Sequence, residues 1–368
     1  MTIGDLGEFG LIARIAAAFP QGAEVSGSQI VLGIGDDAAV LRAPDRRVVA
    51  TTDMLIEGRH FRRDWSAPRD IGHKAAARSL SDVAAMGAAH ASLLVAFAAP
   101  PDLTVAWADE FAAGLAAECA RGGAVVAGGD VAKADAITIA VTALGDLEGR
   151  APVTRAGARP GDVVAVAGLL GHSAAGLALL QRGLAHPAEL IGDHRRPRPP
   201  YEAGPEAAAL GATAMIDVSD GLVADLGHLA AASGVIIEVS TARLRIGGLL
   251  AEAAEGIKTA AAGETRLRDG SPAAGGTAGP APVGTTVPVP GGSAGPVSAE
   301  VSVAALPLSW VLGGGEDYAL AAAFPPATSL PAGWSAIGRV RAQEIGAKAA
   351  VLVDGEPYAG IAGWDHFR

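Results

Sequence analysis

Residues 70–98 read DIGHKAAARSLSDVAAMGAAHASLLVAFA, a helix pattern followed by a strand pattern. Within residues 70–86, Ile71, Ala75, Leu80 and Val83 recur at helical spacing and predict one inner face. Residues 92–98 form a short apolar run, which is typical of a buried strand. Asp82 lies among the apolar residues of this helix, where a carboxylate needs a partner, and a cation is one such partner.

Strand and helix signals alternate on both sides of this stretch. We expect strands at residues 47–52, 124–127, 137–144, 163–167, 213–216 and 235–239, and helices at residues 104–121 and 219–232, with another opening at 171–173. A turn at residues 158–162 suggests a boundary between two domains, residues 1–150 and 151–368. The sequence therefore predicts a two-domain α/β (α+β) protein.

Composition excludes several classes of protein. The chain has 368 residues, half of them apolar, and a formal charge of -11, which argues against nucleic acid as a partner. Its most apolar long window, residues 83–100, is broken by Gly87 and His90, so we expect no membrane span. Residues 1–20 lack a signal-peptide pattern, which predicts a cytoplasmic protein. The single cysteine, Cys119, is either a buried small side chain or a reactive thiol.

Residues 270–296 differ in kind from the rest of the chain. They are almost only Gly, Ala, Pro, Ser, Thr and Val, with no leucine, isoleucine or aromatic residue. Such a stretch cannot bury enough apolar surface to offset its ordering entropy. We therefore expect a disordered surface loop there.

Acidic residues gather at glycine turns and at the expected ends of strands, where α/β folds expose ligand sites. Asp53 and Asp130 are each expected at a strand end, and Asp217 and Asp220 flank a strand-to-helix junction. Any one of them has a structural alternative, since Asp220 or Ser219 could cap a helix. The set comprises Asp36, Asp37, Asp53, Asp82, Asp130, Asp217, Asp220, Glu316 and Asp317.

The available ligand atoms are oxygens, from these carboxylates and from the hydroxyls of Thr51, Thr52 and Ser219. Hard oxygen ligands favour Mg²⁺ or Ca²⁺ over zinc. The chain has no P-loop and no protein-kinase motifs. The residues after Gly33-Ile34-Gly35 are acidic and would repel a pyrophosphate, which argues against a dinucleotide-binding turn. If phosphate binds this chain, metal ions must do most of the neutralising.

Several motifs in order along the chain resemble those of the thiamine-monophosphate kinases. They are Gly7-Glu8-Phe9, Gly33-Ile34-Gly35-Asp36-Asp37-Ala38-Ala39-Val40-Leu41, Thr51-Thr52-Asp53-Met54-Leu55, Glu57-Gly58-Arg59-His60-Phe61, Leu80-Ser81-Asp82-Val83-Ala84-Ala85-Met86-Gly87, Gly128-Gly129-Asp130, Asp217-Val218-Ser219-Asp220-Gly221-Leu222, Gly314-Gly315-Glu316-Asp317-Tyr318 and Gly363-Trp364-Asp365-His366-Phe367.

The resemblance implies a fold of the aminoimidazole ribonucleotide synthetase type, with mixed sheets and packed helices, and a homodimer formed through the N-terminal, ATP- and Mg²⁺-binding domain. It implies ATP-dependent phosphorylation of thiamine monophosphate to thiamine diphosphate. The implied metal ligands are Asp36, Thr51, Thr52, Asp53, Asp82, Asp130, Asp217 and Asp220. The implied ATP contacts are Gly129, Asp130, Arg155 and Ser219, and the implied thiamine monophosphate contacts are His60, Glu316 and Trp364.

Other interpretations stay open at this point. His60 could be an ordinary polar residue, Trp364 a core residue, and Arg155 the partner of a surface acid. An indole stacked on a flat cationic heterocycle would explain Trp364. Residues 258–303 depart from the family pattern. A sibling ATP-using synthetase, or a metal- or nucleotide-binding module without catalysis, would carry a similar cluster of acids.

Overall fold

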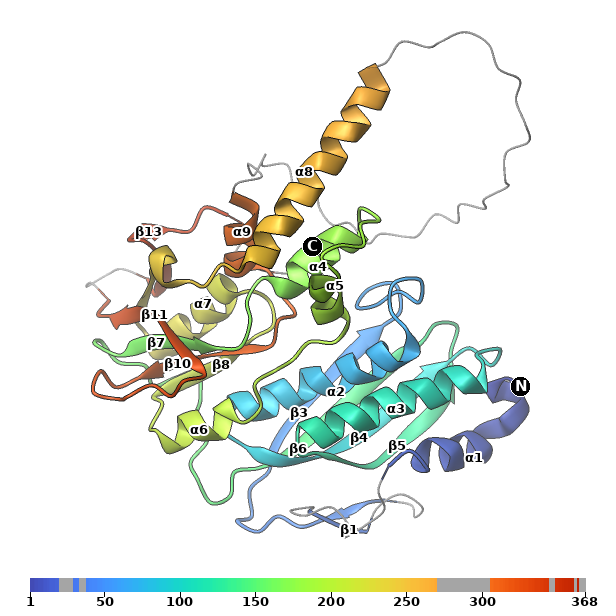
Figure 1. The fold of residues 1–368 in the computed structure, drawn as a ribbon. Helices are drawn as coiled ribbons and strands as arrows, with labels where there is room; N and C mark the ends of the chain where they lie inside the picture. Colours follow the sequence, from blue (N-terminus) through green and yellow to red (C-terminus); the bar gives the residue numbers. More distant parts are fainter. Residues whose placement is uncertain (20–28, 33–37, 270–304, 344–347, 361–362, 364–368) are drawn as a thin grey trace.

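The structure is a computed structural model that describes residues 1–19, 29–32, 38–269, 305–343, 348–360 and 363 (Figure 1). The expectation of a disordered loop at residues 270–296 falls outside the described residues. Asp36 and Trp364, two of the predicted site residues, also lie outside them.

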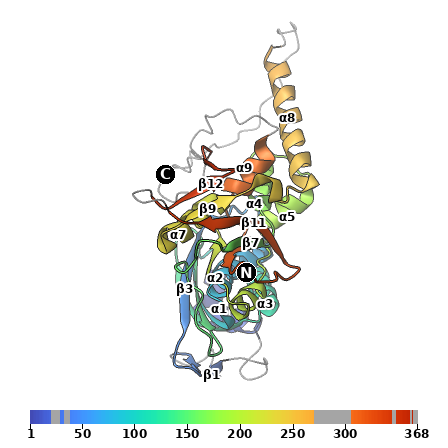
Figure 2. The ribbon, with the colours of Figure 1, turned by 90° about the vertical axis from the view of Figure 1, so that its left-hand side faces the viewer.

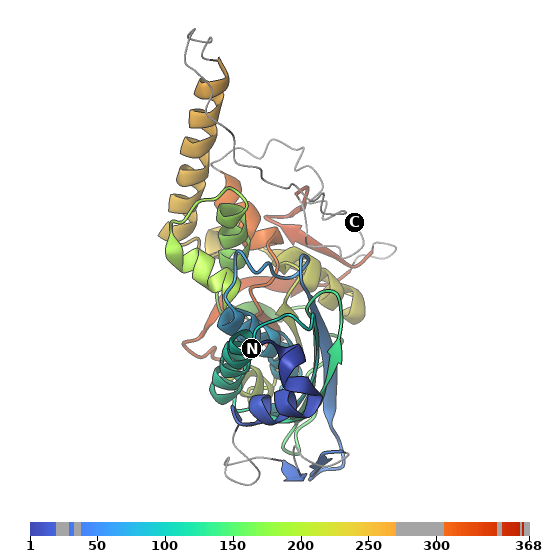
Figure 3. The same cartoon turned by 90° about the vertical axis from the view of Figure 1, so that its right-hand side faces the viewer.

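A four-stranded sheet forms the first half of the molecule, in the order β3 (Val49–Ile56), β6 (Thr138–Asp146), β4 (Ala89–Ala99) and β5 (Val125–Lys133). The β4–β5 pair is parallel and the other two pairs are antiparallel. Helices α1 (Ile3–Ala16), α2 (Pro68–Ala85) and α3 (Val105–Arg121) lie on one side of this sheet (Figures 2 and 3). A small separate sheet pairs β1 (Ile30–Leu32) with β2 (Val40–Leu41).

Small side chains let α2 and α3 approach closely. A Cβ atom on Gly72 would lie 2.0 Å from the carbonyl oxygen of Phe111, and one on Gly114 would lie 2.0 Å from that of Arg69. Thr104 caps α3 by accepting a hydrogen bond from the Trp107 amide. The predicted helix at residues 104–121 is therefore confirmed.

A seven-stranded mixed sheet forms the second half, in the order β13-β12-β9-β11-β7-β10-β8. Its strands are β7 (Val163–Ala167), β8 (Ala214–Val218), β9 (Ile236–Val239), β10 (Ala319–Phe324), β11 (Trp334–Arg341), β12 (Ala350–Val353) and β13 (Glu356–Pro357). Its helices are α4 (His172–Leu180), α5 (Ala188–Arg195), α6 (Ala203–Ala209), α7 (Leu222–Ser233), η2 (Thr241–Arg243), α8 (Gly248–Asp269) and α9 (Leu306–Gly313).

This arrangement is the mixed α/β fold that the sequence predicts. The boundary that we propose near residue 150 falls between β6 and β7. In the part of the chain that the structure describes, every helix is too short or too polar to cross a lipid bilayer.

Three expected element boundaries are wrong. Asp53 and Asp130 do not end strands, because β3 continues to Ile56 and β5 continues to Lys133. Backbone pairing decides both cases, since β3 pairs with β6 along its whole length and β5 pairs with β4 past the two glycines. The helix expected at residues 219–232 begins only at Leu222, after Gly221 with a φ of 141°.

Candidate functional site

Helix α2 presents a polar stripe on an otherwise alanine-rich surface. The stripe consists of Lys74, Arg78, Ser81 and Asp82. Arg78 is four positions after Lys74, and Ser81 and Asp82 are three and four positions after Arg78, so the four residues share one face of the helix. This face meets β3 of the first sheet and β8 of the second. The candidate site is built around it.

Asp53 approaches this stripe from the inner face of β3. Ser79 Oγ donates a hydrogen bond to Asp53 Oδ2 over 3.0 Å, and Arg78 Nη2 lies 3.5 Å from Asp53 Oδ1. The Nε atom of Arg78 is buried and has no hydrogen-bond partner among the residues that the structure describes. The contacts of the guanidinium with Asp53 and Glu316 are long, at 3.5 Å and 3.6 Å, and Asp53 keeps acceptor capacity for a ligand.

Asp82 receives a hydrogen bond from the Thr51 hydroxyl, with 2.6 Å between Thr51 Oγ1 and Asp82 Oδ2. Burial, followed by the charge of Asp53, raises the pKa of Asp82 to about 6. The charge of Arg155 acts in the opposite direction, which places this predicted ATP contact within electrostatic reach of Asp82.

Asp217 brings a third carboxylate to α2, from the end of β8. Ser81 Oγ donates a hydrogen bond to Asp217 Oδ2 over 3.1 Å, and the Asp217 residue is 4% exposed. Burial, followed by the charge of Asp82, raises the pKa of Asp217 well above its ordinary value, and Asp53 adds to the shift. Three carboxylates from the two halves of the chain therefore repel one another around one helix.

Such a group fits a divalent cation, because a cation would remove the repulsion and the oxygen donors suit Mg²⁺. Among the described residues, no three Asp, Glu, His or Cys side chains lie close enough to hold an ion by themselves. Magnesium commonly uses few protein ligands and completes its shell with water and substrate phosphates. Asp53, Asp82 and Asp217 are the described acids that could each contribute an oxygen ligand to such a shell.

The turn after β8 places Ser219 and Asp220 beside this cluster. The Asp225 carboxylate accepts hydrogen bonds from the amides of Asp220 (3.1 Å) and Gly221 (3.0 Å), which fixes the turn. The carbonyl oxygen of Ser219 accepts the Glu316 amide over 2.7 Å. This turn is therefore tied to the segment that carries Glu316.

Glu316 lies between two cations of α2. Lys74 Nζ is 2.9 Å from Glu316 Oε2, and Arg78 Nη1 is 3.6 Å from Glu316 Oε1. Lys74 Nζ also donates to the carbonyl oxygen of His60 over 3.3 Å. The structure thus brings together His60 and Glu316, two of the three predicted substrate contacts.

Thr52, Gly129 and Asp130 stand apart from this cluster. Asp130 is in the same cross-strand row as Ala96, Ala140 and Met54, so its side chain is on the face opposite Asp53. Thr52 shares that face and accepts a hydrogen bond from the Thr142 hydroxyl. Strands β3 and β5 are the two edge strands of this sheet and are three strand spacings apart, so about 14 Å separates their backbones.

Sequence reasoning missed the polar partners on α2. Lys74, Arg78, Ser79 and Ser81 each contact a predicted site residue. The sequence did carry a signal for them, namely a polar residue at every third or fourth position of an alanine-rich helix. The predicted inner face of this helix was built from apolar residues alone and left these polar positions unexplained.

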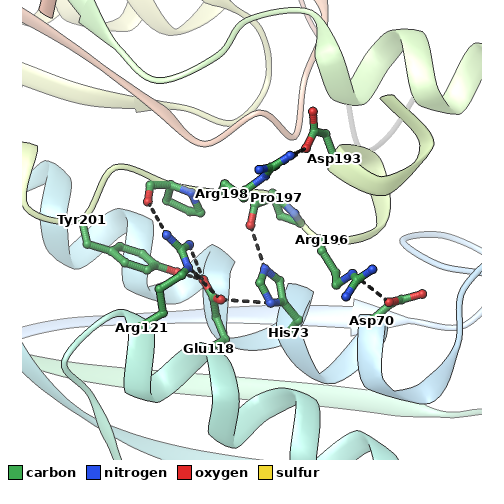
Figure 4. A network of polar contacts seen from close by, with 10 residues as sticks. Asp70, His73, Glu118, Arg121, Asp193, Arg196, Pro197, Arg198 and Tyr201 are labelled. Atoms are coloured by element: carbon green, nitrogen blue, oxygen red, sulfur yellow. Dashed lines mark hydrogen bonds and ion pairs between the residues drawn. The ribbon is translucent and has the colours of Figure 1, made fainter. Parts of the chain in front are cut away.

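A second polar network joins α2 and α3 to residues 193–201 (Figure 4). His73 lies between the Glu118 carboxylate (Nδ1 to Oε2, 2.9 Å) and the Pro197 carbonyl oxygen (2.9 Å). Tyr201 and Arg121 also contact Glu118, whose side chain is 1% exposed. The network joins these two helices to the segment between α5 and α6.

Known proteins match this chain over nearly its whole length. The model of the AIR synthase related protein N-terminal domain matches residues 35–147, and that of the C-terminal domain matches residues 159–264. The chain is 44% identical over 366 residues to the thiamine-monophosphate kinase of Mycobacterium tuberculosis (strain ATCC 25618 / H37Rv), covering 100% of this chain and 93% of that protein.

Two solved structures share the fold over nearly the whole chain. Thiamine-monophosphate kinase from Stenotrophomonas maltophilia K279a has a TM-score of 0.70 at 29% identity, covering 95% of this chain and 96% of that one. AaThiL complexed with AMPPCP and TMP has a TM-score of 0.69 at 31% identity, covering 100% and 99%. The chain therefore belongs to the thiamine-monophosphate kinase family of AIR synthase-related proteins.

Proposed function

We propose that this protein transfers the γ-phosphoryl group of ATP to the phosphate of thiamine monophosphate and forms thiamine diphosphate. The relative with 44% identity along the full chain is named for this reaction, and the AaThiL relative was solved with AMPPCP and TMP. One observation carries the proposal, namely the three carboxylates of Asp53, Asp82 and Asp217 that α2 gathers from both halves of the chain.

We assign metal binding first to these three acids. Ser79, Thr51 and Ser81 each donate one hydrogen bond to them, which orients the carboxylates and leaves other lone pairs open. Bound Mg²⁺ would reduce the repulsion between the two phosphate groups and stabilise negative charge on the transferring group. Asp36, Thr51, Thr52, Asp130 and Asp220 remain proposed ligands.

The acceptor is a phosphate oxygen that is already ionised, so the reaction needs no strong general base. Arg78, Arg155 and Ser219 surround the acids with cationic and polar groups suited to the polyphosphate of ATP. His60 and Glu316 are assigned to thiamine monophosphate, whose ring is cationic. A carboxylate at Glu316 complements that charge.

We also propose a homodimer built on the open face of the four-stranded sheet. That face carries Met54, 49% exposed, and Leu94, 37% exposed, together with Thr52 and Asp130. Dimerisation would cover these apolar side chains. It would also give Thr52, Gly129 and Asp130 a second chain to face, which accounts for their separation from Asp53.

A panel of acceptors tests the proposed function. The protein is incubated with ATP, Mg²⁺ and, in turn, thiamine, thiamine monophosphate or no acceptor, and the products are separated by chromatography. We expect thiamine diphosphate only with thiamine monophosphate, in amounts equal to the ADP formed. A binding module without catalysis would bind ATP and release no ADP. A sibling synthetase would leave thiamine monophosphate unchanged.

A further inference from the structure

Lys74 is the most deeply buried cation of the polar stripe, with 3% of the residue exposed. Burying an ammonium group disfavours its charged form, so a lysine at such a position needs a partner or a role. An apolar side chain would serve packing alone equally well on this alanine-rich helix. The contacts of the Nζ atom point to a role.

One contact of Nζ is with Glu316, which is 242 positions away in the chain. Glu316 has a left-handed backbone, with a φ of 64°, and its amide donates to the Ser219 carbonyl oxygen. Burial would raise the pKa of Glu316, but the positive charges around it, the largest from Lys74, outweigh burial and lower that pKa to about 2, so Glu316 remains a carboxylate. Arg78 Nη1 and His194 Nδ1 lie farther from the Glu316 carboxylate than Lys74 Nζ does, at 3.6 Å and 3.8 Å against 2.9 Å. Lys74 is therefore the principal counter-ion of Glu316.

The other contact of Nζ is with the main chain of the loop that carries His60. The His60 carbonyl oxygen accepts from Lys74 over 3.3 Å, and His60 Nδ1 accepts the Ile56 amide over 3.1 Å. The Gly58 amide donates to the Phe61 carbonyl oxygen over 2.8 Å, which closes the loop. With Nδ1 accepting, the neutral His60 ring carries its proton on Nε2.

We propose that Lys74 is a positioning residue that holds His60 and Glu316 together as one binding surface for the phosphorylated, cationic acceptor. The inference rests on the proposed function, which assigns those two side chains to thiamine monophosphate. Without Lys74, the nearest cation to Glu316 is Arg78 at 3.6 Å, which also faces Asp53. The carboxylate would then turn toward the metal-binding acids and away from the His60 loop.

Binding of the two substrates tests the inference separately from turnover. Calorimetry would measure the Kd of thiamine monophosphate, in the presence of Mg²⁺ and a non-hydrolysable ATP analogue, for the wild type and Lys74→Met. We expect Lys74→Met to raise that Kd at least about tenfold and to leave the Kd of the ATP analogue within about twofold. Lys74→Arg, which keeps the charge, should recover part of the loss.

Two further variants separate positioning from general damage. Glu316→Gln should also raise the Kd of thiamine monophosphate. In the Glu316→Gln background, Lys74→Met should raise that Kd by a smaller factor than it does in the wild type, because the partner of Lys74 is already gone. Arg121→Met removes the cation from another buried carboxylate, Glu118, outside the site (Figure 4). It should lower the melting temperature while leaving the Kd of thiamine monophosphate unchanged.

The inference is overturned if folded Lys74→Met binds thiamine monophosphate as tightly as the wild type, or loses affinity for both ligands equally. If Lys74→Met does not fold, Lys74→Gln replaces it under the same criteria. Failure of the wild type to bind thiamine monophosphate would instead contradict the proposed function.

Discussion

Ser81 Oγ and Asp217 Oδ2 are joined by a hydrogen bond of 3.1 Å between residues 136 positions apart. The bond connects α2, which covers the first sheet, to β8, which edges the second. Both residues are buried, so the contact is shielded from water and strengthened by the low local dielectric. Helix α2 is consequently the element through which the two halves of the chain form a single site.

Asp53→Asn should keep the shape of the side chain and remove the charge proposed to bind Mg²⁺. We expect kcat/KM to fall at least about a hundredfold, which corresponds to roughly 2.7 kcal/mol of transition-state stabilisation. Steady-state kinetics at limiting Mg²⁺ checks this. The control is Asp64→Asn, which removes an exposed acid paired with Arg62. Unchanged activity of Asp53→Asn at limiting Mg²⁺ would remove Asp53 from the metal site.

Phosphoryl transfer should be direct, without a phosphoenzyme. Burial raises the pKa of the Cys119 thiol to about 12, and His194 is buried with its Nδ1 atom hydrogen-bonded to the Ser173 hydroxyl, so neither is an accessible nucleophile. A reaction started with ATP of known chirality at the γ-phosphorus should therefore give thiamine diphosphate with inverted configuration. Net retention would require two successive transfers and would contradict this account.

Assembly should depend on the open face of the four-stranded sheet. Sedimentation of the wild type at micromolar concentration should give twice the chain mass. Replacing both Met54 and Leu94 by glutamate places charges in the proposed interface and should give a monomer. Leu210→Glu, at a residue that is 38% exposed at the end of α6, is the matched control and should remain dimeric. A fully active wild-type monomer would show that this face of the sheet does not bind a second copy of the chain.

Stability should fall in acid through Glu316. Its pKa is lowered from 4.5 to about 2, so its contribution is fully present above pH 4.5 and is lost as the pH falls toward 2. The wild type should therefore be less stable at pH 3.5 than at pH 6.

Urea unfolding at pH 6 and pH 3.5 measures this effect. Glu316→Gln should be less stable than the wild type at pH 6 and should lose less stability on acidification. Glu255→Gln, at an exposed residue on α8, should behave like the wild type. Equal acid losses in the wild type and Glu316→Gln would show that the Lys74–Glu316 pair does not stabilise the fold.

Local sequence patterns predicted the helices and strands better than they predicted which side chains meet in the folded chain. The helix at 104–121 follows from the glycine pair at 122–123 that ends it, and the strand at 163–167 follows from its apolar run, and both are local signals. Asp130 was misplaced at a strand end because strand length depends on pairing with a partner strand. A Cβ atom on Gly129 would meet the Val95 carbonyl oxygen at 2.0 Å, so the glycine permits close strand pairing and does not mark a turn.

The site required tertiary information of the same kind. The sequence identified Asp53, Asp82 and Asp217 as acids, but nothing local shows that they meet around α2 while Asp130 faces the other way. Lys74 gave no motif signal, because its partner Glu316 is 242 positions away. Strand alternation does place Thr51 and Thr52 on opposite faces, which sequence reasoning could have used.

The central claim is that this chain moves a phosphoryl group from ATP to the phosphate of thiamine monophosphate with the help of Mg²⁺. Phosphorus NMR of the complete reaction tests it most directly. The account predicts that the phosphorus signal of thiamine monophosphate is replaced by the two mutually coupled phosphorus signals of thiamine diphosphate, at the rate at which ADP appears. It also predicts that a chelator stops both changes and that added Mg²⁺ restores them. Release of inorganic phosphate with the monophosphate signal intact, or transfer that persists without divalent cation, would contradict it.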